Sequence, residues 1–496
     1  MKKAFAGIIA AAVIIGVGEL VSVPFGSGSS PFVAVGSAVV DNTPEAVRDW
    51  AIDTFGTSDK AALFVGMALV IGLIAAGAGL LRRPRGAILF AVLGVVGVLA
   101  AVTRSTASPL AALPTILGVA AGIVVLHALL RTTDPTHPTE SESMSRRSFL
   151  GLAVAAGFVA VAAGTAGRML GQARSVTANR LGFLLPTPTP QPPIPAGADL
   201  GIDGLASYVT SNEDFYRIDT ALVVPQVPSD TWSLRIHGMV DREMEITFDD
   251  LASREAVERT VTLTCVSNIV GGDLVGNATW IGYPLKDLLD EAGIQEGADM
   301  VLSSSHDAFT AGTPLEALLD GRDALLAVGM NGQPLPVEHG YPARLVVPGL
   351  YGYVSATKWV TDLEVTRFDR ATAYWTDRGW GERGPIKTAA RIDTPASGSD
   401  IDPGPVVIAG VAWKQHTGIS AVDVQIDGGD WVPANLSEEY SKDTWRQWAL
   451  TWDFTPGEHT IRARATDADG EIQTSMTADT VPDGATGYPQ AFVTVR

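Results

Sequence analysis

The sequence predicts a chain in three parts: about five transmembrane helices, then an α+β domain, then an immunoglobulin-like β-sandwich. Three observations predict this order. Five apolar runs fill the first part, mixed helix and strand patterns follow a proline-rich segment, and the last hundred residues alternate like half-buried strands. The expected boundaries are residues 1–180 for the membrane domain, 181–195 for a linker, 196–394 for the α+β domain and 395–496 for the sandwich.

The charge is divided unevenly along the chain. Residues 1–180 carry 14 Lys/Arg and 9 Asp/Glu, a net charge of +5, whereas residues 181–496 carry 21 and 45, a net charge of −24. A basic, apolar first part and an acidic, polar second part indicate a membrane segment joined to a water-facing one. The acidity also argues against nucleic-acid binding, because phosphates would be repelled.

Each apolar run is close to the ~20 residues that a helix needs to cross the hydrocarbon core. Basic residues precede the first run and lie between the second and third and between the fourth and fifth, which predicts a cytoplasmic N-terminus. Everything after Gly167 would then lie outside the cytoplasm, including Arg168, Arg174 and Arg180, a mild violation of the positive-inside rule. The runs are Ala4–Val23, Ala61–Leu81, Gly86–Val102, Pro109–Leu130 and Phe149–Gly167.

Ser145–Gly151 reads SRRSFLG and resembles a twin-arginine export signal, with paired arginines before a moderately apolar helix. An ordinary positive-inside anchor explains the same residues, so both interpretations stay open. Glu19 and His127 are the candidates for function inside the runs, because intramembrane polar groups are costly. A bis-histidine haem needs two axial ligands and only His127 lies in a run, so we expect the membrane part to anchor the protein or dock a partner.

The segment Pro186–Pro195, PTPTPQPPIP, comes before the α+β domain. Its prolines favour polyproline II, so we expect a stiff spacer of ~3.1 Å per residue that holds the next domain clear of the bilayer. Strands are expected beyond it at Trp232–His237, Ile246–Phe248, Ala324–Gly329, Ala343–Val347 and Trp359–Thr366, with a short helix at Leu285–Ala292.

Cys265 is the single cysteine of the 496 residues. Val261, Leu263 and Cys265 alternate with threonines, which predicts a strand, and a glycine-rich loop that reaches Gly276 is expected after it. The thiol therefore stands where a strand meets a loop, a position suited to presenting a soft ligand. A lone cysteine is also often a small buried hydrophobe, and that interpretation stands beside the functional one.

The last hundred residues predict an immunoglobulin-like sandwich without a disulfide. Hairpin turns are expected at Asp427–Asp430 and Asp467–Gly470. The tryptophans of this part are assigned to a core or an interface rather than to a site. Strands are expected at Val406–Trp413, Ala421–Ile426, Arg446–Phe454, Thr460–Ala465 and Ala491–Val495.

Several segments together resemble one family. Asp323–Gly349 reads DALLAVGMNGQPLPVEHGYPARLVVPG, Thr357–Trp359 follows it, and Thr262–Cys265 stands upstream. These residues resemble the sulfite oxidase family of molybdenum–pterin enzymes, in particular its bacterial membrane-anchored members, from about Asp214 to the C-terminus. The resemblance implies a molybdopterin cofactor, oxygen-atom transfer on a small substrate and a C-terminal dimerisation domain.

The resemblance assigns the principal site residues. Molybdenum in this family is held by a pterin dithiolene and one cysteine thiolate, which implies that Cys265 is the metal ligand, and soft sulfur suits this metal. His339 and Arg344 would contact the pterin or its phosphate, for which a guanidinium offers a planar fork. Lys358 and the backbone around Ser355 would add positive charge and amide donors. Without the motif, His339 and Arg344 would be interpreted as a structural pair that fixes a loop.

Weaker matches add four cofactor contacts. Tyr216 and Arg217 occupy the place of a segment that touches the pterin in the family, and Asp219 stands where relatives often have a polar residue. Asn268 matches the family asparagine soon after the cysteine. Asn268 is also a plausible turn residue that bonds its own backbone.

The sequence departs from sulfite-oxidising relatives directly after Asn268. Their motif continues with two arginines, one of which helps bind the anion, whereas Ile269 and Val270 carry no charge. Arg378 and Trp380, in a segment that contributes to the pocket in the family, are the expected catalytic residues beside Cys265. A surface loop with core aromatic residues explains the same segment. The substrate therefore stays open between sulfite, a sulfoxide and another small oxo acceptor or donor.

The leading interpretation is a membrane-anchored molybdenum enzyme. It would have a small oxyanion or sulfoxide-type substrate, a separate electron-transfer partner, contact with membrane lipid and a possible homodimer through the C-terminal domain. Two alternatives stay open: a sulfoxide reductase of the same fold, and a cofactor-free anchored binding or scaffold module.

Overall fold

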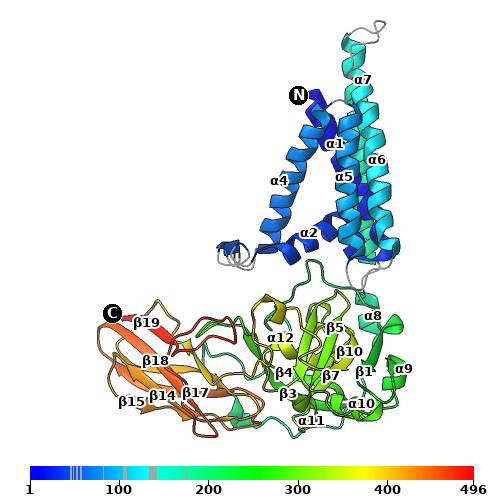
Figure 1. Ribbon diagram of the computed structural model, residues 1–496. Coiled ribbons are helices and arrows are strands. Elements are labelled where there is room, and N and C mark those ends of the chain that lie inside the picture. Colours follow the sequence, from blue (N-terminus) through cyan, green and yellow to red (C-terminus); the bar gives the residue numbers. More distant parts are fainter. Residues whose placement is uncertain are drawn as a thin grey trace. The chain divides into compact units, whose positions relative to one another are not determined.

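The computed structural model describes residues 1–496 except 45–46, 48–49, 52–53, 56–58, 82, 104–108, 133–141 and 174–175. The chain divides into two compact units. The first contains residues 1–176 and 220–226, and the second contains residues 177–219 and 227–496. Figure 1 shows their helices and strands.

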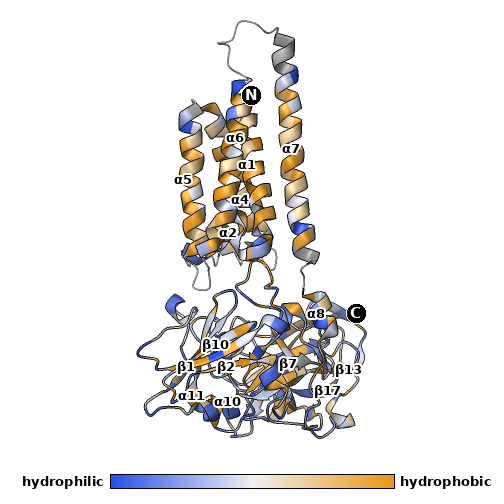
Figure 2. Ribbon diagram, turned by 90° about the vertical axis from the view of Figure 1, so that its right-hand side faces the viewer, coloured by the Kyte–Doolittle hydropathy of each residue, from blue (hydrophilic) through white to orange (hydrophobic). Residues whose placement is uncertain are grey.

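The first unit is helical. Five helices of its described residues are long and apolar enough to cross a membrane, as the five apolar runs predicted. Figure 2 shows hydrophobic residues along their length. They are α1 (Lys2–Ser22), α4 (Asp59–Leu80), α5 (Arg83–Val102), α6 (Leu113–Arg131) and α7 (Glu142–Ala173), and the shorter α2 (Pro31–Asn42) follows α1.

Helix α1 is the centre of this unit, and α4, α6 and α7 pack against it. A Cβ at Gly7 would lie 1.9 Å from the carbonyl oxygen of Ala75, and a Cβ at Gly79 would lie 1.9 Å from that of Lys3. Helices α1 and α4 thus approach so closely that only glycine fits at these two positions. Close packing of this kind holds helices together where lipid removes the hydrophobic driving force.

The polar residues of the apolar runs have different surroundings. The Glu19 carboxylate in α1 accepts a hydrogen bond from the fully buried Ser30 hydroxyl at 2.6 Å, so it has a partner inside the unit. His127 lies half-buried in α6. Four arginines of the predicted orientation and export signal have side chains outside the described residues: Arg82, Arg83, Arg146 and Arg174.

A short segment from the middle of the chain also belongs to the first unit. Residues 220–226 pack there, and Lys60 Nζ donates a hydrogen bond to the carbonyl oxygen of Ala221 at 2.7 Å. Gln226 Oε1 accepts one from the N–H of Val176 at 3.2 Å. The chain therefore returns to the helical unit directly after Asp219.

The proline-rich segment, predicted to be a stiff spacer, packs against strand β3 of the α+β domain. Thr189 forms a parallel bridge with Val257, and its N–H donates to the carbonyl oxygen of Ala256 at 2.7 Å. Gln191 Nε2 donates to Thr260 Oγ1 at 2.8 Å. The segment lies along β3 because an extended backbone satisfies the unpaired groups of an edge strand.

The part that follows has the predicted α+β character, with two sheets and short helices (Figure 1). One sheet has the order β2-β1-β10-β5-β6, in which β1 and β10 are parallel, and the other has the order β3-β4-β7-β8 with β9 paired to β7. The strands are β1 (Ser233–Gly238), β2 (Met244–Thr247), β3 (Val257–Thr264), β4 (Val275–Pro284), β5 (Met300–Ser305), β6 (Thr310–Pro314), β7 (Leu325–Met330), β8 (Gln333–Pro334), β9 (Arg344–Val346) and β10 (Val360–Thr366). The helices are α8 (Thr177–Gly182), α9 (Phe248–Leu251), α10 (Leu285–Ala292), α11 (Leu315–Leu319) and α12 (Gly352–Ser355).

Helix α10 spans the residues predicted for it, because its apolar residues all fall on one buried face. The loop after Cys265 is shorter than predicted. Gly276 belongs to β4, where a Cβ would lie 2.8 Å from the ring of Phe215, so this glycine serves close packing rather than a turn.

The C-terminal part is a sandwich of two sheets, β11-β13-β17-β16 and β12-β19-β18-β14-β15. All five predicted strands are present, and Trp448 and Phe454 lie in the apolar core between the sheets. The strands are β11 (Ala389–Thr394), β12 (Ser399–Ile401), β13 (Gly404–Trp413), β14 (Ile419–Ile426), β15 (Trp431–Pro433), β16 (Asn435–Leu436), β17 (Arg446–Phe454), β18 (Gly457–Asp467) and β19 (Gln490–Val495).

Candidate functional site

Cys265 directly follows the last residue of β3, and the loop after it closes on itself. The N–H of Cys265 donates to the carbonyl oxygen of Leu274 at 2.9 Å. The N–H of Leu274 donates in turn to Asn268 Oδ1 at 2.9 Å. Asn268 therefore makes the turn-forming contact that was the alternative to a cofactor contact, and it holds the cysteine loop in place.

The Cys265 thiol is buried, with 8% of the residue exposed. Burial raises the pKa of this thiol, whereas hydrogen bonds from the Ser267 N–H and hydroxyl and the charge of Lys358 act in the opposite direction. These donors and the cation favour a thiolate, which is the form of cysteine that binds metal ions. Ser267 was missed as a site residue, since a serine in a loop gives little signal in a single sequence.

Tyr216 connects the cysteine to the downstream motif. Burial, and then the neighbouring Cys265, raise the pKa of Tyr216, and Arg344 opposes them. Its ring stacks on Phe215 at 5.2 Å between centroids, and Phe215 meets the ring of His339 edge-on at 5.6 Å. Residues far apart in the sequence therefore lie around one buried region.

Three cations gather there, and we call Arg217, Arg344 and Lys358 the cation cluster. Asp219 Oδ2 lies 2.8 Å from Arg217 Nε and 2.8 Å from Lys358 Nζ. Lys358 Nζ also donates to the carbonyl oxygen of Glu338 at 3.2 Å. One carboxylate is thus shared by two of the cations.

Arg344 makes no ion pair with a carboxylate in the part of the chain that the structure describes. Its Nη1 donates to the carbonyl oxygen of His339 at 3.1 Å, and the guanidinium lies 5.0 Å from the centre of the Trp280 ring. Burial lowers the pKa of Arg344 to about 10, so it stays charged at neutral pH. A buried guanidinium with carbonyl partners alone is costly, which indicates that an anion belongs beside it.

The pKa values of the neighbouring groups agree with an excess of positive charge. Burial lowers the pKa of Lys358 to about 8 despite the favourable contact with Asp219. Burial, and then Arg344, lower the pKa of His339 to about 4, so this imidazole is neutral. The place therefore fits a buried phosphate next to a soft metal ligand, which are the two features of a pterin-bound molybdenum ion.

The backbone next to Lys358 is unusual. Trp359 has a φ of 51°, a conformation that side-chain-bearing residues seldom adopt and that is typical of binding sites when it occurs. Ser355, at the end of α12, donates its hydroxyl to the carbonyl oxygen of Tyr351 at 3.0 Å. The Ser355 hydroxyl is therefore engaged within its own helix, and a cofactor contact from this segment would come from the backbone.

Arg378 and Trp380 belong to an aromatic cluster. The guanidinium of Arg378 lies 3.6 Å from the centre of the Tyr374 ring, and its Nη1 donates to the carbonyl oxygen of Tyr374 at 2.7 Å. Trp380 lies 5.9 Å from the ring of Tyr353 in α12 and 6.1 Å from that of Trp375. These contacts describe a packed loop, and the catalytic assignment of both residues stays a proposal.

A cavity of about 290 Å³ lies beside the cysteine loop. None of the described residues that line it is an arginine. Lys387 lines it, but its Nζ bonds Asp483 Oδ1 at 2.8 Å, and Lys414 and Glu471 carry opposite charges. Its other walls are Thr264, Asn268–Gly271, Tyr351, Thr388–Ala390, Trp413, Ile472–Thr474 and Ala485–Gly487.

Two family models match the chain. Residues 221–375 match the oxidoreductase molybdopterin binding domain, and residues 389–463 match a bacterial Ig domain. The first match defines the class of protein, a molybdopterin-binding oxidoreductase, and agrees with the buried cysteine and cation cluster.

Similar proteins identify the family within that class. An uncharacterised oxidoreductase of Bacillus subtilis, YuiH, is 33% identical over 153 residues, which cover 31% of this chain and 74% of that protein. Human mitochondrial sulfite oxidase is 29% identical over 323 residues, which cover 55% of this chain and 58% of that protein. The chain belongs to the sulfite oxidase family of molybdopterin-dependent oxidoreductases.

The matched regions leave parts of both chains uncovered. This chain spans little more than half the length of the human relative. Among solved structures, the sulfane dehydrogenase SoxCD of Paracoccus pantotrophus is 26% identical, with a TM-score of 0.49, and the match covers 54% of this chain and 75% of that one.

Proposed function

We propose that this protein is a membrane-anchored molybdenum-cofactor oxidoreductase that transfers an oxygen atom to or from a small substrate such as sulfite. The observation that carries the proposal is the buried guanidinium of Arg344, which has no carboxylate partner among the described residues. Arg344 and the single buried cysteine are both neighbours of the buried Tyr216. Bound molybdenum–pterin would supply two-electron redox chemistry and a site for the transferred oxygen.

Each residue of the site has a role in this proposal. Cys265 would bind the metal as a thiolate, and Ser267 would donate hydrogen bonds to its sulfur. The cation cluster would bind the pterin phosphate, and Asp219 would orient Arg217 and Lys358 for it. Neutral His339 would donate or accept a hydrogen bond without adding to the local positive charge. Tyr216 and Asn268 would complete the cofactor site, Tyr216 by contact and Asn268 by holding the cysteine loop closed.

The cavity beside the cysteine loop is the proposed substrate site. Lys387 is paired with Asp483, Lys414 and Glu471 carry opposite charges, and the wall formed by Ile269 and Val270 is apolar. A doubly charged anion gains little from such walls. This observation favours a second candidate function, the reduction or formation of a neutral sulfoxide-type substrate. Arg378 and Trp380 would contribute in either case only if their loop moves toward the cavity.

The first unit supports the proposed anchoring and location. Its five apolar helices support a multi-pass protein of the cell membrane, and the distribution of basic residues supports an extracytoplasmic catalytic domain. Electrons would then be exchanged with a separate protein or a membrane carrier, and the C-terminal sandwich would form the contact of a homodimer.

Elemental and pterin analysis of the purified full chain tests the proposal. About one molybdenum and one pterin per chain is the expected result. If protein purified from a molybdenum-replete host contains neither, the proposal fails and the cofactor-free scaffold interpretation is favoured. Assays in both directions, sulfite oxidation with an artificial acceptor and sulfoxide reduction with an artificial donor, then decide between the two candidate substrates.

A further inference from the structure

Strand β3, which ends at the candidate metal ligand, is an edge strand of its sheet. The proline-rich segment covers the first half of its free edge through Thr189 and Gln191. The immunoglobulin-like domain covers the second half. There the N–H of Thr262 donates to the carbonyl oxygen of Asp443 at 3.0 Å, and the N–H of Trp445 donates to Thr262 Oγ1 at 2.8 Å.

Gln415 of the same domain makes the contact nearest to the cysteine. Its Nε2 donates to the carbonyl oxygen of Thr262 and to Thr264 Oγ1, both at 3.0 Å. Thr264 is the residue before Cys265. Both bonds are buried and come from one amide group. The last residues of the strand are therefore held in place from outside their own sheet.

The stability of the domain does not explain this glutamine. Gln415 Oε1 is buried and has no hydrogen-bond partner among the described residues. An unpaired buried acceptor opposes folding, so an apolar residue of similar length would serve the packing better. The benefit of the amide lies in the two directed bonds that it makes to β3.

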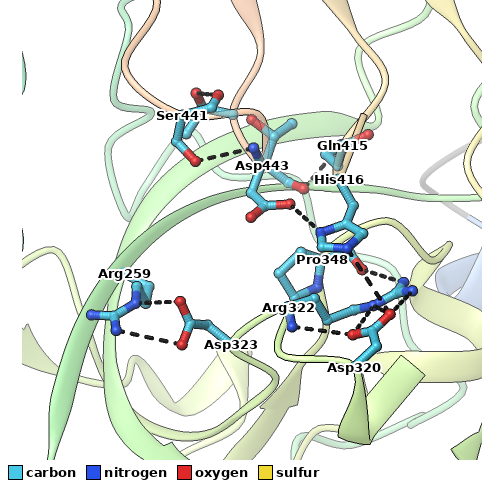
Figure 3. A network of polar contacts seen from close by, with 11 residues as sticks. Arg259, Asp320, Arg322, Asp323, Pro348, Gln415, His416, Ser441 and Asp443 are labelled. Atoms are coloured by element: carbon cyan, nitrogen blue, oxygen red, sulfur yellow. Dashed lines mark hydrogen bonds and ion pairs between the residues drawn. The ribbon is translucent and has the colours of Figure 1, made fainter. Parts of the chain in front are cut away.

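The backbone beside Gln415 is held firmly as well. His416 follows it with a φ of 69°, and its N–H donates to the carbonyl oxygen of Lys442 at 3.0 Å. The His416 ring lies between two carboxylates, with Asp443 Oδ1 at 3.3 Å and Asp320 Oδ2 at 4.0 Å (Figure 3). Asp320 belongs to the α+β domain, so this network joins the two domains next to the glutamine.

We propose that Gln415 is a positioning residue through which the immunoglobulin-like domain sets the place of the Cys265 sulfur. The inference rests on the proposed function, in which Cys265 binds molybdenum. It gives the C-terminal domain a part in tuning the metal site in addition to any part in dimerisation, because a displaced thiolate changes metal–sulfur overlap.

The test compares Gln415→Met with Gln447→Met in the full-length holoenzyme. Gln447 is a buried glutamine of the same domain whose amide bonds the backbone of Leu200 and Ala206. For Gln415→Met we expect retained molybdenum, shifted g values in the Mo(V) electron paramagnetic resonance spectrum, and a roughly tenfold lower kcat at an unchanged KM. Gln447→Met should lower Tm and leave the spectrum and kcat unchanged. A wild-type spectrum and kcat for Gln415→Met, or equal changes in both variants, would overturn the inference.

A second pair of variants covers the case in which Gln415→Met does not fold. Thr264→Ser keeps the hydroxyl that accepts from Gln415, whereas Thr264→Val removes it at nearly the same volume. The inference expects the wild-type Mo(V) spectrum for the serine variant and the shifted spectrum for the valine variant. Identical spectra for the two would contradict it.

A measurement on protein without cofactor separates this inference from the proposed function. Cys265 is the only thiol of the chain, so its alkylation by iodoacetamide can be followed directly. We expect alkylation about fivefold faster in Gln415→Met than in wild type, because the strand end loosens, and unchanged in Gln447→Met. Equal rates in all three proteins would reject the positioning role even if the wild type binds no metal.

Discussion

The cation cluster and the network around His416 are both groups of ionisable side chains, but they pair carboxylates with basic residues differently. In the network, Asp320 Oδ2 lies 2.6 Å from Arg322 Nη2, and Asp443 lies 3.3 Å from His416 (Figure 3). In the cation cluster, Asp219 is the carboxylate that two of three cations share, and Arg344 has carbonyl partners.

This difference is the one expected between a structural group and the proposed binding group. Carboxylates that each lie beside a basic side chain hold chain segments together, and the network does so between two domains of the second unit. An unbalanced buried set is costly in the free protein and becomes favourable when a ligand supplies the missing charge. The sign of the excess charge also indicates the charge of the ligand, because an excess of cations favours an anion such as a phosphate.

The largest effect is expected from removing the proposed metal ligand, Cys265. Cys265→Ser replaces the soft sulfur by a hard oxygen, so we expect loss of molybdenum and a drop in turnover of about 1,000-fold or more. Elemental analysis and a steady-state assay measure both. The Tm of the cofactor-free protein should stay within a few degrees of wild type, because the side chains have nearly the same size; full metal content in the variant would refute the ligand assignment.

The next test replaces one arginine of each group by methionine: Arg344 of the cation cluster and Arg322 of the network around His416. Arg344→Met should weaken binding of the phosphate-bearing pterin by about 100-fold, since a charge-assisted contact contributes ~1.5–3 kcal/mol. It should not lower the Tm of the cofactor-free protein, because a desolvated cation without a carboxylate is removed. Pterin content after gel filtration and scanning calorimetry measure the two effects.

Arg322→Met is the matched control and should behave in the opposite way. Its guanidinium bonds Asp320 and the carbonyl oxygen of Pro348, so its loss should lower Tm and leave pterin content unchanged. Two variants with the same pattern of losses would show that the two charged groups do not differ in kind.

The pH dependence of cofactor binding sharpens the comparison further. The pKa of Lys358 is about 8 in the free protein, lowered chiefly by burial, and a bound phosphate would raise it. Below pH 8 the ammonium is charged in both states, so affinity should stay constant. Above pH 8 binding must take up a proton, so affinity should fall by up to about tenfold per pH unit. Equilibrium binding measured from pH 6 to 10 checks this, and Lys358→Met should remove the dependence.

The smallest effect is expected at a surface ion pair that belongs to neither group. Arg383 Nη1 lies 2.9 Å from Glu316 Oε1, and both side chains are more than half exposed. Arg383→Ala should change the free energy of unfolding by no more than about 1 kcal/mol and leave the KM for substrate unchanged. Denaturant unfolding measures the first quantity, and a raised KM would instead bring Arg383 into the substrate site.

The sequence predicted those features that depend on local pattern. Helix α10 and the strands of the sandwich follow from periodicity and turn residues. The candidate site residues His339 and Arg344 lie in a long motif, and Cys265 lies in a separate segment upstream. Whether these residues meet in space depended on the fold. The pairing of Asp219 with Lys358 joins residues 139 positions apart, and no local pattern encodes such a contact.

Other features could not be predicted from local composition. The proline-rich segment looked like a spacer because composition reports stiffness and not the partners that an extended chain finds on an edge strand. Gln415 and Ser267 act through hydrogen bonds that depend on register and approach, so neither stood out among the polar residues of the chain.

The packing of residues 220–226 in the first unit has a practical consequence for the preparation of a shortened form of this enzyme without its apolar helices. Trimming the chain at the prolines would deprive Ala221 of Lys60, and Gln226 of the Val176 amide. The stretch that loses these bonds begins one peptide bond after Asp219, so local disorder there would first affect the side chains proposed to bind the pterin phosphate. A detergent-free version would therefore need this stretch redesigned with polar residues, and cofactor loss on simple truncation would have a local cause.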